Sequence, residues 1–200
     1  MTVAELLFVG GVLAAGTIIV TLLVTLTTTY RLWPPGDDHW KALLHWGLVG
    51  SFDICTLIVA VLDWNTWMLP RPSSFVIGLV LSVAGGGIFV YSSRVMSRDE
   101  TTGQVTTELY TDGPYAYSRN PQYVGMLIGL FGFVLLANAV HVVVLIGLHA
   151  VWLILLPFAE EPWLRDQFGD EYERYCDHVP RFIGLATIRR LYNQLSVTSL

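Results

Sequence analysis

Two short segments of this sequence concentrate the residues that could do chemistry, and a long apolar stretch separates them. The first segment, Gly113 to Tyr123, is rich in tyrosine, proline and hydrogen-bonding side chains. The second begins at the acidic pair Glu160–Glu161 and continues with aromatic and charged residues. A carboxylate can pair with a cation or accept a proton, arginine can bind a carboxylate through two hydrogen bonds, and aromatic rings attract cations. These residue types predict a binding site with two walls, one from each segment.

The composition indicates a membrane protein. Of the 200 residues, 54% are hydrophobic and only 14% are charged, whereas a soluble domain carries about 25% charged residues. At this length we expect one membrane domain without a separate soluble module. The formal net charge of −5 argues against nucleic acid as a partner. Cys55 and Cys176 show neither metal-ligand spacing nor a disulfide framework, so no metal is expected.

Five apolar stretches predict an all-α, polytopic fold with five transmembrane helices. A hydrocarbon core of about 30 Å needs roughly 20 apolar residues per helix. The turn Asn138–Ala139 is so short that the last two spans should form a helical hairpin, and Gly125 and Gly129 favour close packing of helices, as does the run 85–87. The predicted spans are about 6–26, 41–62, 75–91, 121–136 and 140–158.

The distribution of basic residues predicts the orientation of these spans. With five spans, the loops after the first and third spans share one side with the C-terminal segment. That side carries ten of the eleven Lys and Arg residues, and the other side carries only Arg71. Basic loops stay in the cytoplasm. We therefore expect the N-terminus outside and both polar segments, with their pocket, on the cytoplasmic side of an integral membrane protein.

A series of motifs resembles one enzyme superfamily. In order they are Gly-Pro-Tyr at 113–115, Ser-Arg-Asn-Pro-x-Tyr-x-Gly at 118–125, the hairpin, Glu-Glu at 160–161, Phe-Gly-x-x-Tyr-x-x-Tyr at 168–175 and Val-Pro-Arg at 179–181. This order is similar to that of the isoprenylcysteine carboxyl methyltransferase and phospholipid methyltransferase superfamily. The resemblance covers roughly residues 106–183. It implies that residues 1–92 are three variable spans, 93–184 a cofactor-binding core and 185–200 a tail.

The resemblance implies an S-adenosylmethionine-dependent methyltransferase of the membrane, acting on a lipophilic small molecule or a prenylated substrate. The methyl acceptor could be an isoprenylcysteine carboxylate, a lipid amine, a thiol or a hydroxyl. Glu160, Glu161 and Arg119 are the implied catalytic residues. The implied cofactor-binding residues come from both polar segments: Gly113, Tyr115, Arg119, Asn120, Pro121, Tyr123, Glu161, Tyr172, Tyr175 and Arg181.

The sequence departs from the superfamily pattern at two places. Asn120 stands where many members have histidine, and asparagine can form hydrogen bonds but cannot act as a titrating base. Residues 155–158 are apolar where some prenylcysteine enzymes carry a basic residue, so the acceptor need not be a carboxylate. Glu161 before Pro162 would also suit an ordinary helix start, which is a structural reading of the acidic pair. Asp53, an acid inside the second span, is a candidate for the substrate cavity.

Two other functions remain compatible with these residues. One is a membrane oxidoreductase resembling the sterol reductases, which also end in an Arg-His-Pro-x-Tyr-type motif but bind NADPH. The acidic pair and the Phe168–Gly169 and tyrosine pattern favour the methyltransferase. The other is a membrane scaffold without catalytic activity, which Asn120 and Leu156 would support.

Overall fold

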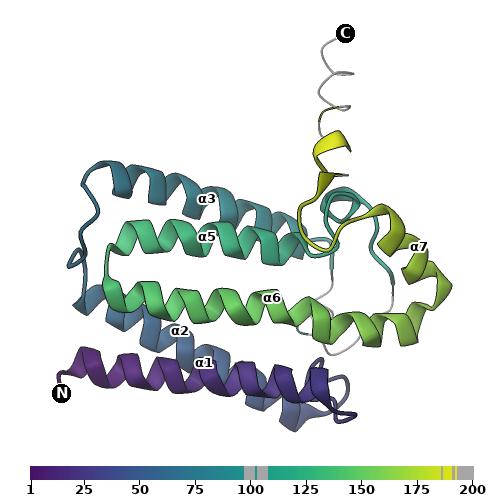
Figure 1. Cartoon of the computed structure of the whole chain (residues 1–200), viewed down its shortest axis with the longest axis horizontal. Helices are drawn as coiled ribbons and strands as arrows, with labels where there is room; N and C mark the ends of the chain where they lie inside the picture. The colour runs from purple at the N-terminus through teal and green to yellow at the C-terminus, as the bar shows by residue number, and fades with distance from the viewer. Residues whose placement is uncertain (97–101, 103–107, 186, 191, 193–200) are drawn as a thin grey trace.

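A computed structural model describes residues 1–96, 102, 108–185, 187–190 and 192 as long helices with a shorter helical segment at one end (Figure 1). No strand occurs in this described part of the chain, which confirms the all-α prediction for it. The elements are α1 (Val3–Thr27), α2 (His39–Leu62), α3 (Ser73–Ser93), the 3-10 helix η1 (Gly113–Ala116), α5 (Pro121–Ala137), α6 (Val140–Phe168) and α7 (Asp170–His178).

Four helices, α1, α2, α3 and α6, are long and apolar enough to cross a membrane, and α5 is an apolar helix of 17 residues. The predicted spans match these helices closely except at the end of α6. We predicted that the fifth span ends near Phe158, but α6 continues to Phe168 with Pro157 and Pro162 inside it. Each proline removes one backbone donor, yet packing of the neighbouring turns supplies most of a helix's stability in a protein. Pro162 therefore does not start a helix.

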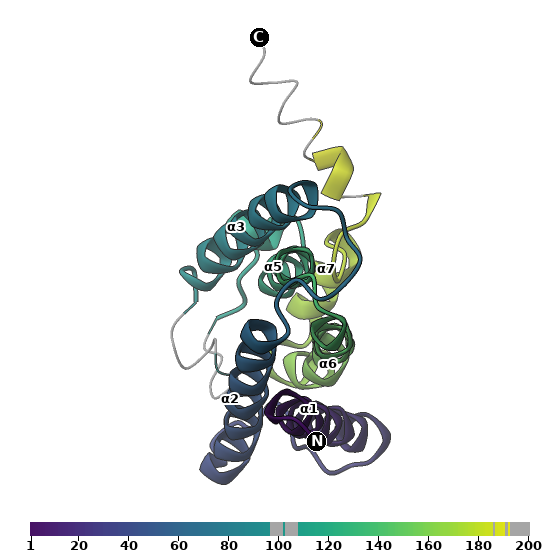
Figure 2. The same ribbon diagram turned by 90° about the vertical axis from the view of Figure 1, so that its left-hand side faces the viewer.

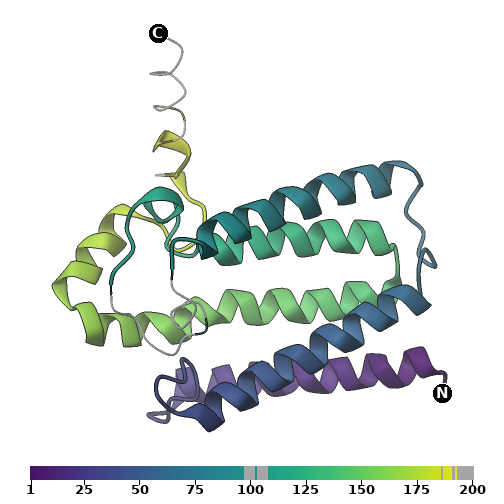
Figure 3. The ribbon, with the colours of Figure 1, turned by 180° about the vertical axis from the view of Figure 1, so that it is seen from behind.

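The long helices run roughly parallel and the chain alternates between the two ends of the bundle. Helix α3 packs extensively on α5, while α1 packs on α2 and α6. The view along the bundle shows α5 between α3 and α6, with α2 beside α6 and α1 below them (Figure 2). Seen from behind, α2 crosses α1 and α6 (Figure 3). The chain runs along the bundle in α1, α2, α3, α5 and α6, so the N-terminus and α7 lie at opposite ends of it.

Glycine allows α3 and α5 to touch through their backbones. A Cβ atom on Gly85 would lie 2.3 Å from the backbone nitrogen of Gly129, and one on Gly125 would lie 2.6 Å from the nitrogen of Phe89. Contacts this short leave room only for hydrogen, so the predicted close packing is found at these two residues. A Cβ atom on Gly86 or Gly87 would meet nothing within 4 Å, and one on Gly129 would come no closer than 3.7 Å, so close packing does not require glycine at these residues.

A network of polar side chains closes the end of the bundle that lies far from α7. Asn138 forms the turn between α5 and α6 in the left-handed conformation, with φ of 49° and 1% of its surface exposed. Its amide nitrogen donates to Asn65 Oδ1 at 2.8 Å and to the Leu69 carbonyl at 3.2 Å, and its Oδ1 accepts from the Leu69 nitrogen at 3.1 Å. Arg71 donates to the Leu136 carbonyl at 2.6 Å, which satisfies an acceptor at the end of α5.

Candidate active site

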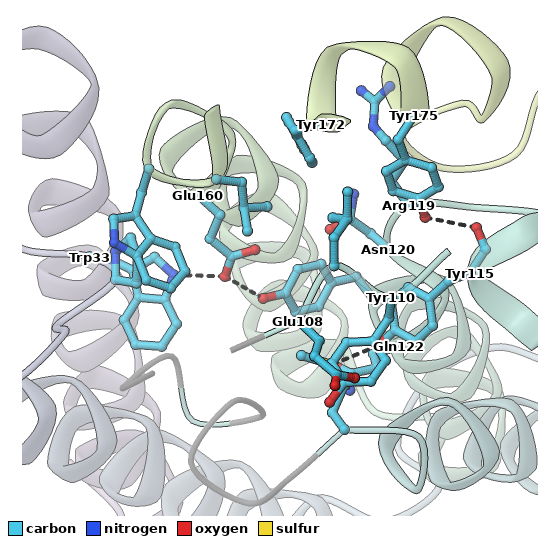
Figure 4. Close-up of a pocket in the computed structure, with 16 residues that line it drawn as sticks. Trp33, Glu108, Tyr110, Tyr115, Arg119, Asn120, Gln122, Glu160, Tyr172 and Tyr175 are labelled. Atoms are coloured by element: carbon cyan, nitrogen blue, oxygen red, sulfur yellow. Dashed lines mark hydrogen bonds between the residues drawn. The ribbon is translucent and has the colours of Figure 1, made fainter. Parts of the chain in front are cut away.

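A cavity lies at the opposite end of the bundle, between η1, the start of α5, the end of α6 and α7. About 110 Å³ of this cavity can hold water-sized molecules, which is several times the space that one water needs. Figure 4 shows its side chains converging from elements far apart in the sequence. The lining residues are Trp33, Pro34, Met96, Glu108, Leu109, Tyr110, Tyr115, Arg119, Asn120, Gln122, Tyr123, Glu160, Trp163, Leu164, Tyr172 and Tyr175.

The loop before α5 is fixed to the chain that follows α7. Gly113 starts η1 with φ of +58°, a conformation that favours glycine, and Pro121 occupies the first turn of α5, where its missing donor costs nothing. Between them, the Arg119 nitrogen donates to the Pro180 carbonyl at 2.9 Å, and the Asn120 amide donates to the Arg181 carbonyl at 2.9 Å. Asn120 therefore has a structural bond that joins the two predicted walls.

Glu161 is the centre of a buried ion cluster. It is 3% exposed, and its Oε1 accepts from Arg119 at 2.8 Å and from Arg181 at 2.6 Å, while Oε2 accepts from Arg181 at 2.7 Å. Arg165 lies 3.7 Å away on the next turn of α6. The remaining terminal nitrogen of Arg119 donates to the carbonyls of Cys176 and Val179. The charge of Glu161 is thus matched by protein side chains, and the cluster ties α6 to both walls.

Glu160 differs sharply from its neighbour, because it lines the cavity and no described cation pairs with it. Its Oε1 accepts hydrogen bonds from the Tyr123 hydroxyl at 2.6 Å and from the Trp33 indole at 2.8 Å. No described residue donates to its Oε2 (Figure 4). A carboxylate can accept about four hydrogen bonds. Glu160 therefore presents free acceptor capacity to the cavity, with no described cation beside it.

Aromatic side chains form much of the remaining wall. Burial raises the pKa of the Tyr172 and Tyr175 phenols, so both stay protonated at physiological pH. The Tyr175 hydroxyl donates to the Tyr115 carbonyl at 2.7 Å and fixes α7 against η1. The Tyr115 hydroxyl, in turn, lies 2.9 Å from the Met96 sulfur. Thioether sulfur is a weak hydrogen-bond acceptor.

The structure brings most of the predicted site residues together, in two groups. Tyr115, Arg119, Asn120, Tyr123, Glu160, Tyr172 and Tyr175 line the cavity. Gly113, Pro121, Glu161 and Arg181 are not among its lining residues; they shape or tie the walls behind it. Asp53 lies apart from both groups, on an exposed part of α2.

Several cavity residues were not expected from the sequence. Glu108 and Tyr110 lie between the third predicted span and the first polar segment, where no residue was assigned a role. Gln122 lies within the Gly113–Tyr123 segment but was not singled out. Trp33 and Pro34 come from the loop between α1 and α2. Trp33 donates to Glu160, which lies 127 residues further along the sequence. A Trp-Pro-Pro sequence after a span signals a loop at the membrane interface, but nothing in it identifies a distant partner.

The sequence of this part of the chain is similar to those of known proteins. The model of the phospholipid methyltransferase family matches residues 73–171. A protein-S-isoprenylcysteine O-methyltransferase of Schizosaccharomyces pombe is 40% identical over 84 residues, which are 38% of this chain and 33% of that protein. The nickel-cobalt-cadmium resistance protein NccN of Alcaligenes xylosoxydans xylosoxydans is 23% identical over 147 residues, 72% of this chain and 65% of NccN. No solved structure matches the chain.

These similarities fall on the elements that build the cavity. The matched residues 73–171 include α3, η1, α5 and α6, together with the acidic pair. Residues 1–72, which contain Trp33, lie outside the match. The alignments span about a third of the first relative and about two thirds of the second. By its residues 73–171, the chain belongs to the phospholipid methyltransferase family and is distantly related to the isoprenylcysteine O-methyltransferases.

Proposed function

We propose that this protein is an integral-membrane methyltransferase that uses S-adenosylmethionine to methylate a lipophilic acceptor. The observation that carries the proposal is the unmatched carboxylate of Glu160 in an aromatic cavity. The amino-acid part of S-adenosylmethionine carries an ammonium group and a carboxylate, and its sulfur is a sulfonium, so the ligand has two positive groups. Such a ligand is recognised by aromatic rings and by a carboxylate that has no other cation beside it.

The residues present fit this cofactor at one further point. The Nε atom of Arg119 is buried and has no hydrogen-bond partner in the described part of the chain, although both terminal nitrogens of its guanidinium are occupied. Buried donors are normally paired, so this orphan marks where a ligand oxygen or a water would complete the site. Glu161 would serve as the structural anchor of the pocket, and Glu160 would hold the cationic group.

When bound, S-adenosylmethionine supplies an electrophilic methyl group. The protein's own part is to align the acceptor with that group and to keep water out, and alignment can be worth effective molarities of about 10⁵ M or more. Tyr123 and Trp33 hold one oxygen of Glu160, while the clamp around Glu161 keeps the two walls at a fixed separation. The family match supports a lipophilic acceptor, which would enter from the bilayer.

Ligand binding tests this proposal directly. The purified protein should gain thermal stability with S-adenosylhomocysteine, by about 2.7 kcal/mol at a concentration of 100 Kd, and should gain none with NADPH. Glu160→Gln should weaken this stabilisation, whereas the exposed Glu171→Gln should leave it unchanged. Stabilisation by NADPH alone would overturn the proposal in favour of an oxidoreductase. Binding without transfer of labelled methyl groups to lipid extracts or to a farnesylated cysteine would favour a scaffold.

We also propose that the chain crosses the membrane five times, with α5 as a span and the N-terminus outside. The lengths of the four longer helices and the alternation of the chain between the two ends support this topology. In a protein whose native cysteines are replaced by serine, Asp170→Cys should react with an impermeant maleimide only after the membrane is opened. Met68→Cys, at the far end and 83% exposed, should react in intact cells. The reverse pattern would overturn the orientation.

A further inference from the structure

We propose that Trp33 positions the carboxylate of Glu160 and thereby sets the affinity of the cavity for the amino-acid half of its ligand. This inference rests on the proposed function and extends it to a residue outside the family match, which begins at residue 73. Trp33 comes from the loop between α1 and α2, yet it lines the cavity and is only 3% exposed. The first two spans would therefore contribute directly to the site.

Trp33 is held in place on three sides. The Thr25 hydroxyl at the end of α1 accepts from the backbone nitrogens of Leu32 at 3.0 Å and Trp33 at 3.2 Å, which fixes the start of the loop. The indole ring stacks on His45 of α2 with 4.0 Å between ring centroids, and Trp46 meets its edge at 6.2 Å. The direction of the indole N–H is consequently set by α1 and α2 together.

That N–H acts on one oxygen of Glu160. Trp33 and Tyr123 both donate to Oε1, from opposite parts of the molecule, at 2.8 Å and 2.6 Å. Two donors on one oxygen fix the rotation of the carboxylate and leave Oε2 without a described donor, on the side of the cavity (Figure 4). Hydrogen bonds to an ionised carboxylate also favour its charged form, which burial alone would disfavour. Trp33 therefore stabilises both the orientation and the charge that an ammonium group would meet.

A comparison of two nucleosides isolates this effect. S-adenosylhomocysteine carries the amino-acid group, whereas 5′-methylthioadenosine has the same nucleoside and a thioether but no ammonium. The ratio of their dissociation constants measures recognition of the amino-acid half. Trp33→Phe keeps an aromatic ring in the wall and removes only the N–H donor. A role limited to packing would change the affinity for both nucleosides equally.

The experiment is calorimetric titration of the full-length protein in nanodiscs with each nucleoside. Trp33→Phe should weaken binding of S-adenosylhomocysteine by about fivefold, since a hydrogen bond to a charged group is lost, and should leave binding of 5′-methylthioadenosine unchanged. Tyr123→Phe, which removes the second donor, should act in the same direction. In a Glu160→Gln background, Trp33→Phe should have no further effect, because the two residues act as one unit. Trp40→Phe, an exposed tryptophan at the start of α2, is the matched control.

Three outcomes would overturn the inference. Equal weakening of both nucleosides by Trp33→Phe would reduce Trp33 to a packing residue. Unchanged affinity for S-adenosylhomocysteine would show that the N–H does not position the carboxylate. A full additional loss in the Glu160→Gln background would show that Trp33 acts independently of Glu160. Failure of the wild-type protein to bind either nucleoside is a different result, which would overturn the proposed function and this inference with it.

Discussion

The two ends of the helical bundle both concentrate polar side chains, but they use them differently. At the far end, Asn138 satisfies all its side-chain donors internally, and Arg71 caps the end of α5. At the cavity end, Glu161 is matched by arginines, while Glu160, one residue earlier, faces the cavity without a described cation. The far end therefore only closes a turn. The cavity end combines a saturated anchor with an unsaturated acid.

The difference teaches how to recognise a site at the edge of a membrane protein. Polar residues at such depth are costly, and most of them pair with one another. A network in which every donor has its acceptor is accounted for by a structural role alone. An acid that accepts hydrogen bonds on one oxygen and keeps the other open has no such structural explanation. The comparison predicts that the saturated groups control stability and that Glu160 controls binding.

The largest expected effect is that of Glu161→Gln. Arg119 and Arg181 would lose the charge that pairs them, and removing one partner of a buried ion pair costs about 3–5 kcal/mol. Thermal unfolding in detergent should show a much lower midpoint, and affinity for S-adenosylhomocysteine should fall because both walls loosen. The exposed Glu171→Gln serves as control. A thermal unfolding midpoint within error of the wild type would show that Glu161 does not anchor the two walls.

Asn138→Ala should come next, with a loss of about 2–4 kcal/mol of stability, because a buried network is left with unpaired groups and the backbone is left-handed at this residue. Affinity for S-adenosylhomocysteine should not change. Asn138→Gly accepts the same φ and should lose less, which separates the hydrogen bonds from the backbone. Weakened ligand binding in either variant would break the contrast between the two ends.

Glu160→Gln should have the opposite profile. The unfolding stability should stay within about 1 kcal/mol of the wild type or rise, since a half-buried carboxyl group without a described cation is replaced by an amide. Affinity for S-adenosylhomocysteine should fall by about tenfold, because an ammonium group loses its carboxylate. Parallel thermal and calorimetric measurements on one preparation check both halves. A large loss of stability with full affinity would reverse the roles assigned to the two acids.

The smallest expected effect concerns Asp63 at the far end, whose carboxylate lies 2.8 Å from His141. Burial works to raise the pKa of Asp63, but the hydrogen bonds from His141 and Thr66 and the charge of His141 lower it overall. The stability that Asp63 contributes is thus present above its ordinary pKa and lost as the pH falls through the lowered one. Asp63→Asn should cost less than about 1 kcal/mol at neutral pH. Unfolding midpoints of the two proteins should converge as the pH falls below the ordinary pKa of an aspartate; a constant difference would contradict this origin.

Much of the fold follows from local signals in the sequence. Apolar length located every long helix, and the short Asn138–Ala139 turn predicted the hairpin of α5 and α6. The glycines predicted close packing of helices, but not that Gly85 and Gly125 would meet each other. The end of α6 was not predicted, because a proline inside a helix is tolerated only when tertiary packing compensates.

The site was predictable only where its residues form motifs. The sequence could bring Tyr115, Tyr123 and Glu160 to one place, since a short hairpin returns the acidic pair to the level of the first motif. It could not separate the roles of Glu160 and Glu161, because adjacent helical residues point about 100° apart and only the packed structure shows what each one meets. Trp33 was not predicted as a site residue for a related reason, because its partner is set by how α1 and α2 pack.

The clamp between the two walls has a consequence for synthesis of the protein in the cell. The loop before α5 is held by carbonyls of Val179, Pro180 and Arg181, which are made after all the long helices. The membrane helices can therefore insert before the residues that hold the loop at the cavity have been synthesised. A nascent chain stopped at residue 178 would be a membrane protein with its helices in place and its pocket unassembled. Maturation of the site is thus a late step of biogenesis, because it waits for residues 179–181, which follow every long helix.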